Sequence, residues 1–347
     1  MAPFASNPLP GPDTRGEMTA ATQDVSWADV SVIICTKDRP EELARAIASV
    51  RASGKSGRSA EIVVVEEGDN PRHLRGVRYV HLPRHGRGFG HARNVGIRAA
   101  GGDIVLFMDD DCEAAPAWLD SLLAPLLSDP EVLGVAGAVL VRECGLIGYA
   151  ENILGFPGGG LRYLHEARGR VVPTRYLSTC NCAYRRDAVI RAGGFPEEAR
   201  FGGEDFLLAE RVATLGRCLY APDGVVYHRP RGRLCEVFRW FVRRGESEIM
   251  LLHATTARRS FGRYLLRSSW IVRLLLLVAV LGRWPQVAIL LPPAGILYYG
   301  LILWRFRFAR AYPSHRQAWW LVPIVKLTMD LGMELGRWKG LLSRGRR

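Results

Sequence analysis

Three consecutive carboxylates, Asp109, Asp110 and Asp111, follow an apolar run over residues 104–108. A short apolar run bounded by polar residues is typical of a buried central strand, and open α/β sheets bind their ligands at the carboxyl ends of such strands. Adjacent carboxylates repel one another, and Mg²⁺ or Mn²⁺, which prefer oxygen ligands, relieve that repulsion. The pattern predicts a divalent-cation site. The alternative interpretation is an acidic turn before the next helix.

A second acidic pair, Glu204 and Asp205, follows two glycines and precedes a helical pattern over 206–215. Such a pair can serve in acid–base chemistry, or it can simply favour the start of a helix through the helix dipole. Other polar residues stand at the ends of predicted strands or on a predicted helix. Thr36 and Glu67 could be turn residues only, and Arg93 could be a solvated helix residue.

The elements that would position these side chains alternate along the chain. Because strands and helices alternate through residue 141, we expect βαβ units around a mostly parallel sheet, hence an α/β fold. Residues 145–176 have little periodicity and three consecutive glycines, and we expect a mobile loop or lid there. The predicted strands cover 30–35, 62–65, 77–82, 104–108, 132–141, 218–221 and 225–228, and the predicted helices cover 40–52, 91–100, 119–127 and 206–215.

The seven cysteines have no disulfide-framework spacing, which indicates a reducing compartment. Cys180 and Cys182 form a C-x-C motif with His228 further along, but no second pair matches zinc spacing, so we do not expect zinc there. Residues 1–28 lack the apolar core of a signal peptide, and we expect a flexible tail.

The charge of the chain divides sharply. Residues 1–250 hold 31 Lys and Arg against 32 Asp and Glu, whereas residues 251–347 hold 16 against 2. The basic part is also the most apolar, which favours an anionic membrane surface over nucleic acid. We predict basic amphipathic helices over 234–268, a hydrophobic hairpin formed by 270–282 and 287–304, and an interfacial stretch over 319–335.

Five motifs then occur in the order found in family 2 glycosyltransferases with the GT-A fold. They are Val32-Ile33-Ile34-Cys35-Thr36-Lys37-Asp38-Arg39, Glu66-Glu67-Gly68, Ala92-Arg93-Asn94-Val95-Gly96, Asp109-Asp110-Asp111 and Gly203-Glu204-Asp205. The resemblance covers about residues 29–233. It implies a GT-A catalytic domain there, after the tail 1–28 and before the amphipathic segment 234–268 and the membrane-associated segment 269–347.

The resemblance also implies roles for individual residues. Thr36 and Arg39 would line the nucleotide pocket, Glu67 would bind the base, and Arg93 would approach the base or the phosphates. Glu66-Glu67 replaces the more usual Asp-Asp, so the nucleotide is not specified. Asp110 would contact the ribose and the metal shell, Asp109, Asp111 and His228 would hold Mn²⁺ or Mg²⁺, and Asp205 would be the general base.

The implied reaction is an inverting transfer from a nucleotide-diphosphate sugar to a hydroxyl of a lipid-linked or cell-envelope glycan acceptor. A cation neutralises the leaving diphosphate, and a carboxylate on the opposite face accepts the proton of the incoming hydroxyl. We expect an enzyme at the cytoplasmic membrane with its catalytic domain in the cytosol. A catalytically silent binding subunit is the alternative, and the charge distribution does not favour nucleic acid as a partner.

Overall fold

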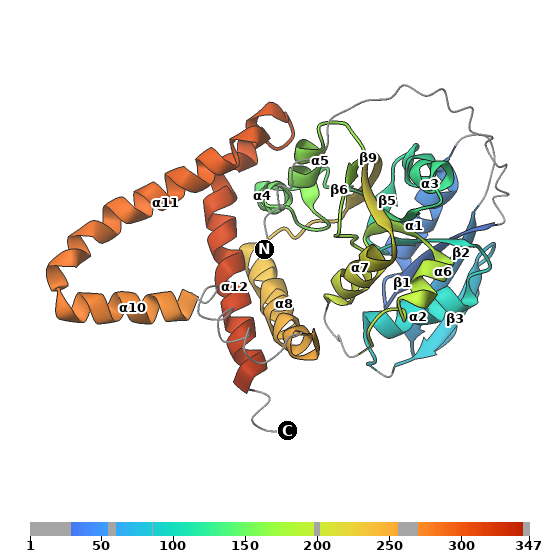
Figure 1. The fold of residues 1–347 in the computed structure, drawn as a ribbon, viewed down its shortest axis with the longest axis horizontal. Coiled ribbons are helices and arrows are strands. Elements are labelled where there is room, and N and C mark those ends of the chain that lie inside the picture. Colours follow the sequence, from blue (N-terminus) through green and yellow to red (C-terminus); the bar gives the residue numbers. More distant parts are fainter. Residues whose placement is uncertain (1–28, 55–59, 85, 198–201, 256–269, 343–347) are drawn as a thin grey trace.

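The computed structural model describes residues 29–54, 60–84, 86–197, 202–255 and 270–342, and its centre is a nine-stranded sheet (Figure 1). The strand order is β3-β2-β1-β4-β8-β6-β9-β5, and β7 pairs with β9. The strands are β1 (Val30–Thr36), β2 (Glu61–Gly68), β3 (Arg78–Pro83), β4 (Ile104–Met108), β5 (Cys112–Ala114), β6 (Val132–Leu140), β7 (Val172–Pro173), β8 (Asn181–Arg185) and β9 (Arg217–His228).

Helices cover both faces of this sheet. Strand β1 is buried on both sides, with Val32 and Ile34 in one core and Ile33 in the other. The first core packs against α1 and α3, and the second packs against α2, α6 and α7. This burial explains the unbroken apolar runs of the central strands. The helices are α1 (Pro40–Ala52), α2 (Phe89–Ala99), α3 (Trp118–Ser128), α6 (Arg186–Arg191) and α7 (Glu204–Leu215).

The expected α/β fold is confirmed, and the sheet is mixed. Strands β3, β2, β1 and β4 run parallel, and β6 and β9 are also parallel to each other. Strand β8 lies between β4 and β6 and is antiparallel to both. It was missed in the sequence because its residues, Asn-Cys-Ala-Tyr-Arg, include no β-branched side chain. The two short strands expected over 218–228 are one strand with a register shift opposite Gly137 and Ala138.

Residues 145–176 are not the loop that we expected. They form α4 (Leu146–Ile153) and α5 (Gly160–Ala167) before β7. Ile153 and Leu161 are buried in a third core, together with residues from the C-terminal quarter of the chain. The periodicity was unrecognisable because this segment packs against partners that are distant in sequence.

The C-terminal segment begins with α8 (Leu234–Thr255), which packs along α12 (Val322–Leu342). Val237 and Phe241, which lie in the segment predicted to form amphipathic helices at a membrane surface, are buried in the third core. Gly332, Gly336 and Gly340 of α12 face the backbone of α8, and this close approach leaves little room for lipid. The elements between these helices are α10 (Trp270–Arg283), η2 (Pro285–Leu290), α11 (Leu291–Arg305), η3 (Arg307–Ala311) and η4 (Arg316–Leu321).

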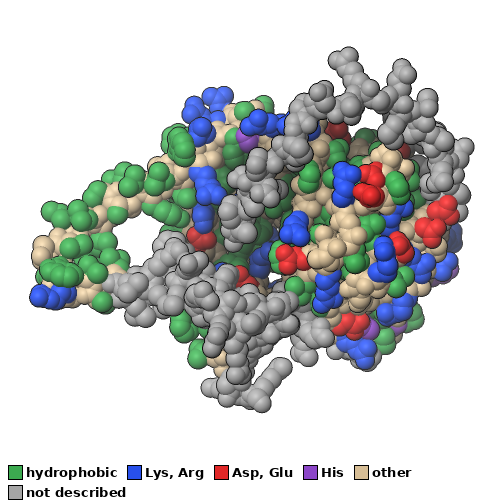
Figure 2. Space-filling view, viewed as in Figure 1, with side chains coloured by type: hydrophobic (Ala, Val, Ile, Leu, Met, Phe, Trp, Pro, Cys, Tyr) green, Lys and Arg blue, Asp and Glu red, His purple; other side chains and the backbone are tan. Residues whose placement is uncertain are grey.

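Helix α10, η2 and α11 form an arm that projects from the body of the molecule (Figure 1). Hydrophobic side chains surround much of it (Figure 2). Within the described part of the chain, Pro285–Arg305 is one helical stretch long and apolar enough to cross a membrane. Its Ile289 and Ile296 side chains are 78% and 75% exposed. The arm therefore corresponds to the predicted hydrophobic hairpin.

Candidate active site

The candidate site lies where the strand order changes direction. The chain leaves β1 toward β2 and β3 on one side, whereas β4 pairs with β1 on the other side. Open α/β sheets have a crevice at such a switch point, at the carboxyl ends of the strands. Thr36 ends β1, and Asp109, Asp110 and Asp111 follow β4 directly. The topology thus brings the first and the fourth sequence motifs together.

Asp110 is the most enclosed of the three consecutive carboxylates. Thr36 Oγ1 donates to its Oδ2 at 2.7 Å, and Arg39 Nη1 donates to its Oδ1 at 3.0 Å. The same Arg39 nitrogen donates to Asp111 Oδ2 at 3.0 Å. Burial raises the pKa of Asp110 to about 6. The hydrogen bond from Thr36 lowers this pKa, whereas the negative charge of Asp111 raises it. Thr36, Arg39, Asp110 and Asp111 therefore form one network, and their expected contacts with the nucleotide and the metal stay predictions.

The two glutamates that end β2 have different environments. Glu66 is buried and accepts from Arg72 Nε at 2.8 Å and from the Tyr79 hydroxyl at 2.8 Å. Glu67 instead pairs with Lys37 Nζ at 2.8 Å. Glu67 also borders a small cavity whose other walls include Leu82, Gly88 and Ala92. Of the two, Glu67 is the one placed to meet a ligand, and Lys37 is a partner that sequence reasoning did not single out.

Arg93 is a buried link between two of the acidic motifs. Its Nη1 donates to Glu204, and its Nη2 lies 3.3 Å from Asp109 Oδ1. Burial alone would lower the pKa of Arg93, but Glu204 and Asp109 raise it above its usual value. Burial also raises the pKa of Glu204, against the effect of Arg93. Arg93 thus ties the carboxylates after β4 to the start of α7, and its expected contact with the nucleotide stays a prediction.

Asp205 lies in the first turn of α7, after Gly203, which has the positive φ of 94° that favours glycine. Its neighbour Glu204 is turned toward Arg93, whereas Asp205 accepts from the Phe206 amide at 2.8 Å. Asp205 is half-buried and makes no ion pair with the residues that the structure describes. Its other carboxylate oxygen has no hydrogen-bond partner among the described residues, and its role as a base stays a prediction.

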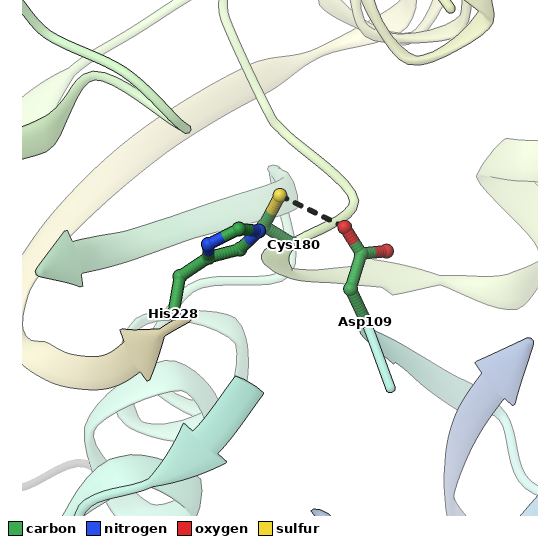
Figure 3. A group of neighbouring side chains, drawn as sticks. All are labelled: Asp109, Cys180 and His228. Atoms are coloured by element: carbon green, nitrogen blue, oxygen red, sulfur yellow. Dashed lines mark hydrogen bonds between the residues drawn. The ribbon is translucent and has the colours of Figure 1, made fainter. Parts of the chain in front are cut away.

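Oxygen, nitrogen and sulphur donors converge beside this network. His228 Nε2 lies 3.3 Å from Asp111 Oδ1, and donor atoms of Asp109, Cys180 and His228 lie within 4.8 Å of one another (Figure 3). Cys112 forms a similar group with Asp111 and His228. Two carboxylates and an imidazole fit a divalent cation such as Mn²⁺. His228 is thus grouped with Asp109 in one set and with Asp111 in the other, and a single site formed by all three predicted metal ligands stays a prediction. Cys180 belongs to the first set, although the sequence did not lead us to expect zinc at Cys180, Cys182 and His228.

Part of the chain is similar in sequence to proteins of known function. Residues 31–193 match the family model described as Glycosyl transferase family 2. A pre-mycofactocin glycosyltransferase from Mycobacterium tuberculosis is 28% identical over 237 residues, which cover 63% of this chain and 46% of that protein. A glucosyl-dolichyl phosphate glucuronosyltransferase from Haloferax volcanii is 24% identical over 216 residues, which cover 58% of this chain and 66% of that protein. The chain thus spans about half the length of the first relative.

The fold has a counterpart among solved structures. A mannosyltransferase from Pyrobaculum calidifontis, in complex with GDP-Man and Mn²⁺, is similar with a TM-score of 0.57 at 20% identity. The similarity covers 91% of this chain and 87% of that one. The motifs, the sheet topology and the family match agree, and residues 31–193 are therefore identified as a glycosyltransferase family 2 domain with the GT-A fold.

Proposed function

We propose that the protein is a metal-dependent inverting glycosyltransferase that acts on a lipid-linked acceptor at the cytoplasmic membrane. The observation that carries this proposal is the position of Arg93, whose guanidinium contacts both Asp109 and Glu204. One side chain thereby connects the carboxylate cluster at the switch point to the start of α7, where Asp205 lies. Inverting transfer needs a leaving group on one side of the sugar and a base on the other, and these two groups of carboxylates are our candidates for the two sides.

The donor half of the site follows from the residues at the ends of β1, β2 and β4. Glu67 and the cavity beside it receive the base, Arg93 approaches the base or the phosphates, and Thr36 and Arg39 line the nucleotide pocket with Asp110 near the ribose. Asp109, Asp111 and His228 would hold Mn²⁺ or Mg²⁺. When bound, the cation supplies positive charge that offsets the charge developing on the diphosphate.

The acceptor half of the site contains the proton acceptor. As the glycosidic C–O bond forms and the bond from the sugar to the diphosphate breaks, the acceptor hydroxyl transfers its proton to an Asp205 carboxylate oxygen. Attack from the face opposite the leaving group inverts the anomeric centre.

An arginine of α8 supports an anionic acceptor. The Arg244 guanidinium lies 5.4 Å from the Phe156 ring centroid and 5.5 Å from that of Trp240, and it makes no ion pair with the described residues. Burial raises the pKa of Tyr176, Asp205 raises it further, and Arg244 opposes this rise. Arg244 and Asp205 thus both affect the pKa of the Tyr176 hydroxyl. A lipid phosphate bound by Arg244 would place its attached sugar toward Asp205.

The arm supports a membrane location, with the catalytic domain in the cytosol. Its exposed Ile, Leu and Trp side chains would be buried in lipid, and arginines follow it at 305, 307 and 310. A polysaccharide acceptor remains the alternative. The two kinds of acceptor are distinguished by a transfer assay with the purified full-length enzyme in detergent. The assay contains Mn²⁺ and a panel of nucleotide sugars.

The acceptors in this assay are a polyprenyl-phosphate glycan and the matched glycan without lipid. Release of nucleoside diphosphate with glycosylation of the lipid-linked glycan alone supports the proposal. Transfer to both acceptors alike contradicts the lipid-linked acceptor. Nucleotide-sugar binding by thermal shift without any turnover would instead favour the catalytically silent binding subunit.

A further inference from the structure

Cys180 lies among the residues expected to hold the donor metal. Its Sγ donates to Asp109 Oδ2 at 3.0 Å, and both atoms lie within 4.8 Å of a ring nitrogen of His228. Figure 3 shows the three side chains converging from three different segments of the chain. A thiol, a carboxylate and an imidazole in this arrangement form a mixed hard and soft donor set, which carboxylates alone do not provide.

The sheet fixes two of these donors opposite each other. Strands β4 and β8 are antiparallel, with Met108 opposite Asn181, so Asp109 and Cys180 are the next residues at the same edge. The third donor, His228, ends β9. Its side chain is 10% exposed, and its Nδ1 is buried with no hydrogen-bond partner among the described residues. The backbone therefore brings the donors together before any ion binds.

We propose that Cys180, Asp109 and His228 form a binding site for a thiophilic divalent cation such as Zn²⁺ or Co²⁺. When the cation binds, the Cys180 S–H bond breaks, a sulphur–metal bond forms and the proton leaves to solvent. The Asp109 oxygen that accepted the thiol hydrogen bond is then free to bind the cation. Three protein ligands leave one position of a tetrahedral zinc open.

The C-x-C spacing did not predict this site, because Cys182 does not take part. Cys180 packs in one core and Cys182 in the other, because Cys180 lies in the turn before β8 and Cys182 lies on the strand. The second donor of the group is Asp109, which is distant from Cys180 in sequence. The site shares Asp109 and His228 with the proposed Mn²⁺ site, so Zn²⁺ should compete with Mn²⁺. This competition, unlike the binding itself, rests on the proposed function.

Co²⁺ tests the proposal by a signal independent of activity, because a cobalt–thiolate bond gives a charge-transfer band in the near ultraviolet. Purified full-length protein is titrated with CoCl₂ as wild type, Cys180→Ser and Cys218→Ser. Cys218 is also buried, but it lies at the other end of β9 and serves as the matched control. We expect a saturable band in the wild type and in Cys218→Ser, its loss in Cys180→Ser, and its disappearance on addition of Zn²⁺.

Two results would overturn the assignment. The first is the absence of a band in the wild type, and the second is a band that persists in Cys180→Ser. Persistence in Cys180→Ser with loss in Cys112→Ser would assign the thiolate to the neighbouring Asp111, Cys112 and His228 group. X-ray absorption of the Zn²⁺-loaded wild type needs no variant, and a sulphur scatterer at about 2.3 Å is expected.

Activity measurements separate this inference from the proposed function. Zn²⁺ should inhibit Mn²⁺-supported sugar transfer in the wild type, and Cys180→Ser should require at least about tenfold more Zn²⁺ for the same inhibition, as expected when one ligand is lost. Sugar transfer without a cobalt band contradicts only the thiolate site. A cobalt band without sugar transfer contradicts only the proposed function.

Discussion

The three adjacent aspartates differ in their surroundings more than their sequence suggests. Asp109 contacts Arg93 and Cys180, Asp110 is enclosed by Thr36 and Arg39, and Asp111 contacts Arg39 and His228. Two arginines thus offset part of the repulsion between three carboxylates without closing the site. The remaining negative charge favours a divalent cation.

Replacing Asp111 by Asn tests the metal role. The amide keeps the shape of the side chain but removes one negative charge from the proposed cation site. We expect sugar transfer to be abolished and the Mn²⁺-dependent part of nucleotide affinity to be lost, with an unchanged circular dichroism spectrum. Asp223→Asn, at an exposed position, is the control and should behave as wild type. Equal activity of the wild type with Mn²⁺ and after complete chelation would contradict the metal role.

Replacing Asp205 by Asn separates catalysis from donor binding. A positioned general base contributes about 10²–10⁴-fold to turnover, so we expect kcat to fall by that factor while the Kd for the nucleotide sugar stays near that of the wild type. Glu210→Gln, on the exposed side of the same helix, is the matched control. Weaker donor binding at unchanged kcat would instead assign Asp205 to substrate positioning.

At the scale of elements, α8 and α12 form the support of the C-terminal segment. A Cβ added at Gly336 would lie 2.0 Å from the Val242 carbonyl oxygen, and one at Gly332 would lie 2.7 Å from that of Phe238. Both distances are shorter than contact between these atoms allows. The spacing of four residues keeps these glycines on one face of α12, so the two helices approach closely.

Gly336→Ala should separate these helices. The added methyl group must displace backbone rather than a flexible side chain, so we expect a loss of stability of about 1–3 kcal/mol. Thermal unfolding in detergent measures it as a lower Tm. Gly300→Ala in α11 is the control, since nothing lies within 4 Å of its added Cβ. A Tm for Gly336→Ala equal to that of the control would contradict the close packing.

A buried histidine joins the C-terminal segment to the catalytic domain. His315 is 3% exposed, its Nε2 lies 3.1 Å from Asn152 Oδ1 in α4, and its Nδ1 lies 2.9 Å from Ser314 Oγ. Asn152 in turn donates to the Val139 carbonyl of β6 at 3.1 Å. This chain of contacts links η4, α4 and the central sheet, and burial lowers the pKa of His315 from 6.5 to about 4.

The pKa of His315 predicts a stability change in mild acid. Between about pH 6.5 and 4 the unfolded chain binds the proton and the folded chain does not, so this contribution to stability is complete above the unfolded pKa and declines as pH falls. We expect the Tm of the wild type to fall between pH 7 and pH 5 by more than that of His315→Gln. The exposed His73 supplies the control His73→Gln, which should keep the wild-type dependence. Parallel profiles for wild type and His315→Gln would refute the role of His315.

At the scale of the whole molecule, the arm projects away from the catalytic domain (Figure 1). Ile324, Leu327 and Leu331 recur at helical spacing on α12 and are exposed, as is Trp320 in the preceding η4, while the glycines of α12 face α8. This apolar face, exposed in the part of the chain that the structure describes, lies in the predicted interfacial stretch, and its contact with a membrane stays a prediction until membrane binding is measured.

The arm can be tested directly for spanning. Gln286 is exposed near the bend between α10 and α11, and Arg305, Arg307 and Arg310 follow the arm. Because basic residues concentrate on the cytosolic side, the bend should face outward. A single cysteine at Gln286, in a background without other reactive thiols, should be labelled in intact cells by a membrane-impermeant reagent. Labelling only after lysis would mean that the arm lies in one leaflet, and a matched cysteine at Asp223 should be labelled only after lysis.

The sequence by itself determined the α/β fold, the central strands and the acidic residues of the site. The strands were recognisable because residues such as Val32, Ile33 and Leu106 are buried on both faces, which requires unbroken apolar runs. Asp109, Asp110 and Asp111 were recognisable because three carboxylates at a strand end are rarely stable without a counter-charge. Apolar runs and adjacent carboxylates are formed by residues that are neighbours along the chain, so both can be recognised in the sequence.

The tertiary structure decided which distant residues complete the site. Only the pairing of β4 with β8 places Cys180 beside Asp109, and only the fold places Glu204 on Arg93 so that Asp205 stays unpaired among the described residues. Likewise, α4 is a helix because its apolar residues meet α8 and η4, which lie far along the chain. Contacts between residues far apart in sequence carry no local periodicity, so they appear only once the chain is folded.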